Sequence, residues 1–366
     1  MASNTCTAMK LLIVIGTRPN FIKVTQFKAV ARRHPGLDIE IVHTGQHYDR
    51  KMAGIFFEQF NLQPDHFLEL KGNSPSDQFG HMIADMGTLI RQIGPDAVMV
   101  PGDVNSTLAG ALAANRCNTP LFHLESGLRS FDRSMPEEIN RILVDQITDK
   151  YFVTEQSGLD HLKAEGLDTK SGKQQAYLVG NTMIDTIVAF DDRIQRDPIL
   201  DVLDAQAGDF VLMTMHRPSN VDNQEGLSFI ADIIGKAVDG RNVIFPMHPR
   251  TRKRCEELGL WSTFEAFDNL QVIDALDYFA FQKLISTAHT VITDSGGIQE
   301  ETTFRQVPCI TVRDNTERPS TIAIGTNTLV DRDIETIHNL MHKPKEGSIP
   351  PFWDGQATGR ILDIIA

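Results

Sequence analysis

The sequence of 366 residues contains few cysteines, no long apolar run and no excess of positive charge. The four cysteines, Cys6, Cys117, Cys255 and Cys309, are too widely spaced to form a CxxC metal or redox pair. Scattered thiols in a chain of this size are typical of a reducing compartment, so we expect a cytoplasmic protein. The first apolar run, LLIVIG at 11–16, is too short for a membrane span or a secretory signal.

The formal net charge of −13 argues against nucleic acid and anionic membranes as partners, because both favour a basic face. An anionic small substrate would have to meet basic residues that are gathered locally. The sequence also lacks the GxGxxG dinucleotide fingerprint and the GxxxxGK[ST] phosphate loop. We therefore expect neither a tightly bound nicotinamide cofactor nor ATP-driven chemistry.

Short apolar runs alternate along the chain with longer amphipathic segments. The runs are LLIVIG (11–16), IEIVHT (39–44), AVMVPG (97–102), LFHLES (121–126), YFVT (151–154), AYLVG (176–180), FVLMTMH (210–216), NVIFPMH (242–248), LQVID (270–274), TVITDS (290–295) and PCITVR (308–313). Continuous β-branched runs are typical of strands that are covered on both faces. Helical spacing between them predicts βαβ units and parallel sheets.

The chain length and two similar sets of runs predict two doubly wound, Rossmann-like α/β domains. We place the first domain at 1–182 and the second at 183–352, with Asp185–Asp209 as a polar helical bridge or linker between the two sets of runs. A final helix at about 353–366 is expected to return to the first domain. Nearly every run ends in charged, hydroxyl or glycine residues, and doubly wound sheets bind ligands at these strand ends. One site in the cleft between the domains is the simplest expectation.

The segment TDSGGIQEE at 293–301 has the composition of a phosphate-binding turn. Ser295, Gly296 and Gly297 would open a helix whose free N–H groups bind phosphate, and glycine would let that phosphate approach closely. Glu300 or Glu301, one turn later, could accept hydrogen bonds from ribose hydroxyls. The alternative is an N-capped helix with a tight turn.

The segment GTRPNFIK at 16–23 is another strand-to-helix turn. Arg18 and Lys23 would lie near the helix start, where the helix dipole disfavours positive charge. Such a local conflict is expected at an anion site, although solvent-exposed cations are the alternative.

Carboxylates gather at the ends of two successive runs. Asp103 directly follows AVMVPG and Glu125 lies in HLESGLRS, while PEEINR adds Glu137 and Glu138 shortly afterwards. Crowded carboxylates suit general acid–base chemistry because their pKa values are pushed apart. The alternative is helix capping by Asp103 and surface exposure of the glutamate pair.

Histidine and arginine end two runs in the second half, as His216-Arg217 and as His248 with Arg250. The ligand spacing of a zinc site is missing, so we expect no metal and favour contacts with phosphate or sugar. The segment RDNTERPS adds Arg313 near the same sheet edge.

The combination of these motifs resembles the non-hydrolysing UDP-N-acetylglucosamine 2-epimerases. The segments that carry the resemblance, in family order, are GTRPNFIK, TGQH, GD, HLESGLRS, PEEINR, VGNTMID, the HR of TMHRPSN, TDSGGIQEE and RDNTERP. The resemblance implies a two-domain fold of glycosyltransferase-B type, a homodimer, and a cofactor-free conversion of UDP-N-acetylglucosamine into UDP-N-acetylmannosamine. The route it implies is elimination of UDP to give 2-acetamidoglucal, followed by re-addition of UDP.

The resemblance also implies residue roles. The implied catalytic residues are Asp103, Glu125, Glu137 and His216. The implied substrate-binding residues are Arg18, Lys23, His216, Ser295, Gly296, Gly297, Glu301 and Arg313, to which the strand-end argument adds Arg217. Asp103, Glu125 and Glu137 would move the C2 proton and assist cleavage of the C1–O bond. The turn Ser295-Gly296-Gly297 would cradle the diphosphate.

Several positions depart from the family pattern, which commonly has TRPE, HRREN and TERPE. This chain has Asn20, Pro218 and Ser320 there. Because some members bind a second nucleotide sugar through QHR-type residues and the second arginine of HRRE, the stretch Gln46-His47-Tyr48 and Pro218 argue against an activator site here. At these positions the chain also resembles relatives that act on UDP-2,3-diacetamido sugar acids. The retained TERP segment instead favours N-acetylglucosamine as the sugar of the substrate. The sequence also leaves open a hydrolysing 2-epimerase and a glycosyltransferase. A silent UDP-sugar sensor is a further alternative, but the carboxylate set of Asp103, Glu125 and Glu137 argues against it.

Overall fold

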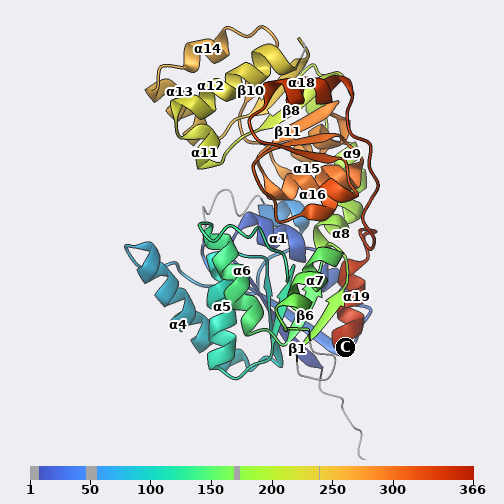
Figure 1. The fold of residues 1–366 in the computed structure, drawn as a ribbon. Coiled ribbons are helices and arrows are strands. Elements are labelled where there is room, and N and C mark those ends of the chain that lie inside the picture. The colour runs from blue at the N-terminus through green and yellow to red at the C-terminus, as the bar shows by residue number, and fades with distance from the viewer. Residues whose placement is uncertain (1–7, 47–55, 169–173, 239) are drawn as a thin grey trace, which may run out of the picture. The chain divides into compact units, whose positions relative to one another are not determined.

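The computed structural model describes residues 8–46, 56–168, 174–238 and 240–366. The chain divides into two compact units (Figure 1), the first made of Met1–Ala189 and Pro351–Ala366 and the second of Phe190–Pro350. The predicted boundary after residue 182 falls at the start of α8 (Thr182–Ala189), whereas the structure keeps the whole of α8 in the first unit. The reason is packing, because α8 contacts α1 (Arg18–Val24) and the C-terminal helix α19 (Ala357–Ile365).

The described part of the first unit contains one parallel sheet with the strand order β3-β2-β1-β4-β5-β6-β7. Its strands are β1 (Met9–Ile15), β2 (Leu37–His43), β3 (His66–Phe67), β4 (Ala97–Pro101), β5 (Leu121–Leu124), β6 (Lys150–Val153) and β7 (Gln175–Leu178). Its helices are α1 (Arg18–Val24), α2 (Phe27–Ala31), α4 (Pro75–Ile93), α5 (Asn105–Arg116), α6 (Pro136–Gln146), α7 (Gln156–Ala164), α8 (Thr182–Ala189) and α19 (Ala357–Ile365).

The described part of the second unit contains a parallel sheet with the strand order β10-β9-β8-β11-β12-β13. Its strands are β8 (Phe210–Thr214), β9 (Asn242–Pro246), β10 (Leu270–Ile273), β11 (Thr290–Thr293), β12 (Cys309–Val312) and β13 (Asn327–Val330). Its helices are α9 (Asp191–Gln195), α10 (Ile199–Val202), α11 (Pro218–Val221), α12 (Gln224–Asp232), the π-helix η1 (Ile233–Ala237), α13 (Pro249–Glu257), α14 (Trp261–Glu265), α15 (Tyr278–Thr287), α16 (Gly296–Arg305), α17 (Pro319–Ala323) and α18 (Ile334–His342).

Every predicted apolar run forms a strand, and both sheets are parallel and doubly wound, so the predicted fold class is confirmed. The central strand β1 shows why its run is continuously apolar. Leu12 and Val14 pack in the core beneath α4 and α5, while Leu11 and Ile13 point to the opposite face. All four side chains are at most 1% exposed, which requires helices on both faces.

The C-terminal helix α19 belongs to the first unit (Figure 1). It contacts α2 and α8 there. Its first turn is held by Asp185 of α8, whose carboxylate accepts hydrogen bonds from the backbone N–H groups of Ala357 (3.1 Å) and Thr358 (2.6 Å). These are orphan donors of a helix N-terminus, and a buried acceptor satisfies them. Burial raises the pKa of Asp185, and these backbone hydrogen bonds oppose that shift.

Candidate active site

The strand order reverses next to the first strand of each sheet, and the candidate site residues lie at these reversal points. In the first unit β1 lies between β2 and β4, and in the second unit β8 lies between β9 and β11. Helices and loops leave such a pair of strands in opposite directions, which opens a crevice at the carboxyl ends. The residues that follow β1 and β4, and those that follow β8 and β11, are therefore favourably placed for ligand binding.

In the second unit, the contacts at the reversal point centre on Asp294, which directly follows β11. Its side chain is fully buried, and Oδ1 lies 2.8 Å from Nδ1 of His216, which follows β8. Oδ2 accepts hydrogen bonds from the backbone N–H of Arg217 (2.9 Å) and from Nδ2 of Asn220 (3.0 Å). The backbone N–H of His216 also donates to this carboxylate at 3.1 Å. One carboxylate thus joins the ends of two neighbouring strands.

The surroundings of Asp294 keep it ionised. Burial by itself raises the pKa of this carboxyl group, but hydrogen bonds from His216, Asn220 and the backbone of Arg217 outweigh burial and hold the pKa below its usual range. The His216 side chain is 57% exposed, so its imidazole faces solvent while the carboxylate that holds it is buried. Sequence reasoning assigned no role to Asp294, although it lies within the TDSGGIQEE segment.

The Ser-Gly-Gly turn opens α16, as predicted. Ser295 is the residue before the helix, yet its side chain makes no capping hydrogen bond, so its hydroxyl is not used to cap α16. A Cβ atom on Gly296 would lie 2.6 Å from Oε1 of Glu317 and 3.0 Å from Nη1 of Arg318. Gly297 continues the first turn of the helix. The structure therefore gives Gly296 a reason that the sequence did not show, which is to admit the Glu317–Arg318 ion pair against the helix start.

Arg313, Glu317 and Arg318 of the segment RDNTERPS form a buried network with Glu300 beside this turn. Arg313 donates from Nη2 to Glu317 at 3.1 Å, Glu317 also pairs with Arg318, and Nε of Arg318 lies 2.8 Å from Oε2 of Glu300. Burial, together with the nearby cation Arg217, lowers the pKa of Arg313. Nε and Nη1 of Arg313 are buried and have no acceptor among the described residues. Buried donors of this kind suit an anionic ligand.

The two glutamates of TDSGGIQEE differ in their contacts. Glu300 is completely buried and pairs with Arg318, whereas Glu301, the residue implied to hold ribose, is 6% exposed. The sequence left both residues open for the ribose, and the ion pair now assigns Glu300 to the buried network. Whether Glu301 holds ribose stays a prediction.

In the first unit, Lys23 and Glu125 form a buried ion pair that joins α1 to the loop after β5. Nζ of Lys23 lies 2.6 Å from Oε2 of Glu125, and the two side chains are 6% and 3% exposed. Lys23 lies in the last turn of α1, not near the helix start as predicted, so the expected conflict with the helix dipole does not apply to it. Glu125 has a φ angle of +67°, a left-handed conformation that is uncommon for glutamate.

Asp103 is held by a second ion pair. Oδ2 of Asp103, which is 18% exposed, lies 2.6 Å from Nη2 of Arg141, and Nη1 of Arg141 lies 2.8 Å from Glu138. Glu138 also accepts hydrogen bonds from the backbone N–H groups of Ser130 (2.9 Å) and Phe131 (3.0 Å). The alternative of a surface-exposed glutamate pair therefore holds for Glu137 but not for Glu138, whose side chain is 1% exposed.

Glu137 and Arg18 lie on the surface of the first unit. Glu137 is exposed in the first turn of α6, next to the buried Glu138. Arg18 begins α1 and is exposed, with its guanidinium 5.1 Å from the ring centroid of Phe56. The departure at Asn20 has a local explanation, because its amide donates to the carbonyl of Pro101 at the end of β4 (3.1 Å). A glutamate could not donate that hydrogen bond.

A buried network of charged side chains supports the turn at Gly102 and Asp103. Nδ1 of His123 lies 2.7 Å from Oδ1 of Asp145, and its Nε2 lies 2.8 Å from the carbonyl oxygen of Gly102, directly before Asp103. Arg129 pairs with the same Asp145 at 2.7 Å. Burial raises the pKa of Asp145, but His123 and Arg129 outweigh burial and leave it lowered. His123 is a core histidine, as predicted, but it is also linked to the Gly102–Asp103 turn.

The positions weighed in the sequence for an activator site, Gln46-His47-Tyr48 and Pro218, have local structural explanations where they are described. Gln46 accepts a hydrogen bond from the backbone N–H of Ser106 at 2.9 Å and so caps α5, while His47 and Tyr48 lie outside the described residues. Pro218 opens the short helix α11, a position that suits proline.

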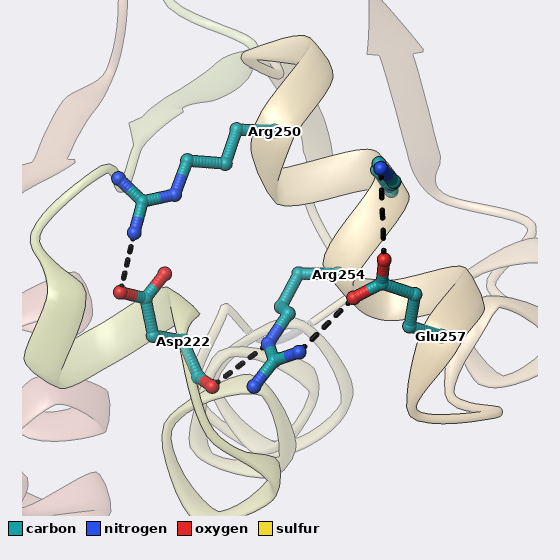
Figure 2. Close-up of a pocket in the computed structure, with 5 residues that line it drawn as sticks. Asp222, Arg250, Arg254 and Glu257 are labelled. Carbon is teal, nitrogen blue, oxygen red and sulfur yellow. Dashed lines mark hydrogen bonds and ion pairs between the residues drawn. The ribbon is translucent and has the colours of Figure 1, made fainter. Parts of the chain in front are cut away.

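His248, the histidine after β9, accepts a hydrogen bond at Nδ1 from the backbone N–H of Arg250 at 3.2 Å. His248 precedes α13, and a surface depression of about 310 Å³ lies beside that helix. Figure 2 shows that its cations are already paired, Arg250 with Asp222 (2.6 Å) and Arg254 with Glu257 (3.0 Å). Within the described ranges, no group of three or more His, Cys, Asp or Glu side chains is arranged to hold a metal. No helix in the same ranges has the length and apolarity needed to cross a membrane.

Comparison with known proteins decides the family. The family model described as UDP-N-acetylglucosamine 2-epimerase matches residues 29–366. The chain belongs to the UDP-N-acetylglucosamine 2-epimerase family. It is 36% identical to the UDP-N-acetylglucosamine 2-epimerase of Methanocaldococcus jannaschii, covering 98% of this chain and 99% of the relative. It is also 39% identical, with the same coverage, to the UDP-2,3-diacetamido-2,3-dideoxy-D-glucuronate 2-epimerase of Pseudomonas aeruginosa.

Solved structures of the family share this fold. The M. jannaschii enzyme, crystallised with UDP-GlcNAc and UDP, has a TM-score of 0.87 at 36% identity and covers 98% of this chain and 99% of its own. The Neisseria meningitidis UDP-GlcNAc 2-epimerase bound to UDP-GlcNAc has a TM-score of 0.85 at 26% identity, again covering 98% and 99%. The chain therefore has the two-domain, glycosyltransferase-B type architecture that its sequence predicts.

Proposed function

We propose that the chain converts UDP-N-acetylglucosamine into UDP-N-acetylmannosamine without a cofactor, by eliminating UDP and adding it back. Membership of the epimerase family, with relatives of that name at near full length, is the observation that carries this proposal. The anchored carboxylates Asp103 and Glu125 at the crevice of the first unit support it, because proton transfer at C2 needs positioned acid–base groups.

The chemistry of the substrate explains why such groups are needed. The C2 proton of this sugar is not adjacent to a carbonyl, so direct abstraction is difficult. Loss of UDP from C1 offers another route. The C1–O electron pair leaves with the diphosphate, the C2–H pair forms the C1–C2 double bond, and a base takes the proton. Re-addition of UDP, with a proton delivered to the other face of C2, completes the inversion.

We assign the proton transfers and C1–O cleavage to the first unit. Asp103, Glu125 and Glu137 are the proposed acid–base residues, and Lys23 holds Glu125 in place. Arg18, exposed at the start of α1, is the proposed contact to the phosphates from this unit. Arg141, which lies 2.6 Å from Asp103, holds this carboxylate in position.

We assign the nucleotide to the second unit. Ser295 and the N–H groups of the turn at Gly296 and Gly297 would bind the diphosphate, as helix N-termini do for anions. Arg313 supplies buried donors without acceptors among the described residues, and Arg217 lies near enough to affect its pKa. Glu301 is the proposed ribose contact. The released UDP must stay bound until it adds back, so a firm grip on the nucleotide is essential.

The test is incubation with UDP-N-acetylglucosamine in heavy water, followed by NMR. We expect UDP-N-acetylmannosamine and deuterium at C2 of both recovered sugar nucleotides. Glu137→Gln should abolish the exchange, whereas Glu257→Gln, a surface glutamate on α13, should leave it unchanged. Free N-acetylmannosamine with UDP would indicate a hydrolysing enzyme. UDP release only with an added acceptor would indicate a glycosyltransferase, and binding without exchange a sensor.

A second substrate is favoured by one comparison, the 39% identity to the P. aeruginosa enzyme named for a UDP-2,3-diacetamido sugar acid. The retained TERP segment favours N-acetylglucosamine. Measuring kcat/KM for both sugar nucleotides under the same conditions decides between them. A value at least tenfold higher for the sugar acid would reassign the substrate while keeping the reaction type.

We further propose a cytoplasmic homodimer without nucleic-acid or membrane partners. The family resemblance supports the dimer, and the acidic chain with scattered thiols supports the compartment. Light scattering coupled to size exclusion should give twice the chain mass of 40.8 kDa. A monomer across the micromolar range would contradict the dimer.

A further inference from the structure

Asp294 and His216 connect the two strands at the reversal point of the second sheet, because Asp294 follows β11 and His216 follows β8. We propose that Asp294 is a positioning residue that holds His216 in the tautomer with hydrogen on Nδ1, so that Nε2 is the ring nitrogen that meets the diphosphate. The inference rests on the proposed function. It adds the residue that determines which nitrogen of His216 can act.

The hydrogen-bond donors around Asp294 show that its carboxylate is an acceptor throughout. The backbone N–H groups of His216 and Arg217 can only donate, and they reach it at 3.1 and 2.9 Å. The orientation of the Asn220 amide follows from Arg332, whose Nη2 donates to Oδ1 of Asn220 at 3.4 Å. Nδ2 of Asn220 therefore faces Asp294, at 3.0 Å. Three of the four contacts therefore come from groups that donate, which favours the ionised carboxylate, because among these neighbours only Nδ1 of His216 could accept a hydrogen from it.

The tautomer of His216 follows from the ionised carboxylate. Oδ1 of Asp294 lies 2.8 Å from Nδ1 of His216, a hydrogen-bond distance, so Nδ1 must carry the hydrogen. The pKa of Asp294, held below its usual range despite burial, agrees with an ionised acceptor. In the neutral ring, Nε2 then keeps its lone pair, and in the protonated ring Nε2–H is the available donor.

The arrangement gives His216 a defined task during loss of UDP. The breaking C1–O bond leaves its electron pair on a diphosphate oxygen, where negative charge develops. A protonated His216 can donate from Nε2 to that oxygen, and Asp294 stabilises the imidazolium from behind. Arg217 contributes a second cation nearby, because its Nε donates to the Asp294 carbonyl at 3.2 Å. The proton on Nε2 stays on the ring, so the step remains balanced when UDP adds back.

The sequence context makes Asp294 suited to this task. It lies directly between β11 and the turn that opens α16, so the carboxylate that orients His216 is one residue from Ser295. Its fully buried position keeps the pair rigid, whereas the His216 ring is 57% exposed and accessible to ligand. Diphosphate binding at the turn and orientation of His216 are thereby linked through one short segment.

The first test examines the wild-type protein without substrate, by ¹⁵N NMR of histidine-labelled enzyme. We expect His216 to be hydrogenated at Nδ1 when neutral, assigned by loss of its signals in His216→Gln. In Asp294→Asn, the amide can donate to Nδ1, and the tautomer should change to hydrogen on Nε2. Finding hydrogen on Nε2 in the wild type would overturn the inference, whether or not the variant folds.

The second test is a double-mutant cycle on turnover. Asp294→Asn should lower kcat by about 10²–10⁴-fold while changing the dissociation constant for UDP by less than about threefold. In a His216→Gln background the same substitution should have little further effect on kcat, because Asp294 acts through the ring. Additive losses would show a merely structural role and overturn the inference. A wild type that epimerises no UDP-sugar would instead overturn the proposed function, which the NMR result distinguishes.

Discussion

Lys23 and Glu125 form an ion pair in the interior of the first unit, with Nζ and Oε2 2.6 Å apart and both side chains almost fully buried. The pair joins the last turn of α1 to the loop after β5. A Cβ on Gly102 would lie 2.9 Å from Nζ, so the turn before Asp103 closes against the same ammonium group. The conformation of the loop that carries Glu125 therefore depends on a lysine that lies about a hundred residues earlier in the chain.

Lys23→Met should destabilise the protein by about 3–5 kcal/mol, because it leaves Glu125 buried without this counter-ion. The double variant with Glu125→Gln should recover part of that loss, since the remaining carboxamide is neutral. Turnover should be lost in both. Urea denaturation measures the free energies of unfolding, and a Lys23→Met variant as stable as the wild type would contradict the importance of the pair.

Glu137 and Glu138 are adjacent but should respond oppositely to substitution. Glu137 is exposed, so Glu137→Gln should change the free energy of unfolding by less than about 0.5 kcal/mol and reduce kcat by about 10²–10⁴-fold. Glu138→Gln should lower stability by about 2–3 kcal/mol, because Glu138 accepts from the 130–131 backbone and from Arg141. Equal thermal stabilities of the two variants would argue against this division.

Gly296→Ala should weaken both stability and UDP binding. The added Cβ would lie 2.6 Å from Oε1 of Glu317, and relieving the contact must move the Glu317–Arg318 pair away from the start of α16. Gly80→Ala is the matched control, since its Cβ would meet nothing within 4 Å in α4. That control should stabilise the protein by about 0.5–1 kcal/mol. Calorimetry with UDP measures the affinity, and unchanged binding by Gly296→Ala would exclude this role.

His43 should make the stability of the protein depend on pH. Burial lowers the pKa of His43 from 6.5 to about 4, so the unfolded chain binds this proton at higher pH than the folded protein. The contribution of His43 is complete above pH 6.5 and decreases as pH falls towards 4. Over this range the change in the free energy of unfolding amounts to about 3.5 kcal/mol, at about 1.4 kcal/mol per pH unit. His43→Gln should remove this part of the slope, and identical pH slopes for wild type and variant would contradict the burial of a neutral ring.

Sequence patterns were sufficient for most of the strands because the sheets are covered on both faces. The two strands that they missed are β3 (His66–Phe67) and β13 (Asn327–Val330). Each is an edge strand, which is paired on one side only, so its residues need not form a long apolar run. The second unit also begins later than predicted, since no local pattern shows that α8 packs on α1 and α19.

The motifs identified which residues could act, but not what holds them. Asp294, Arg141 and Asn20 received no role, although the first directly precedes Ser295 and the second lies within PEEINR. Their partners are distant in the chain. Asp294 contacts residues after β8, and Asn20 contacts the end of β4. Spacing along a sequence carries no information about such pairs.

The sequence by itself determined the family, the parallel sheets and the residue types at the strand ends, because these follow from local periodicity and from motifs a few residues long. Tertiary structure alone decided that Glu138 is buried while Glu137 is exposed, and that Gly296 accommodates a carboxylate. It also decided that one buried aspartate orients His216. Each of these depends on long-range packing, where the burial of charge and the positions of distant donors set the outcome.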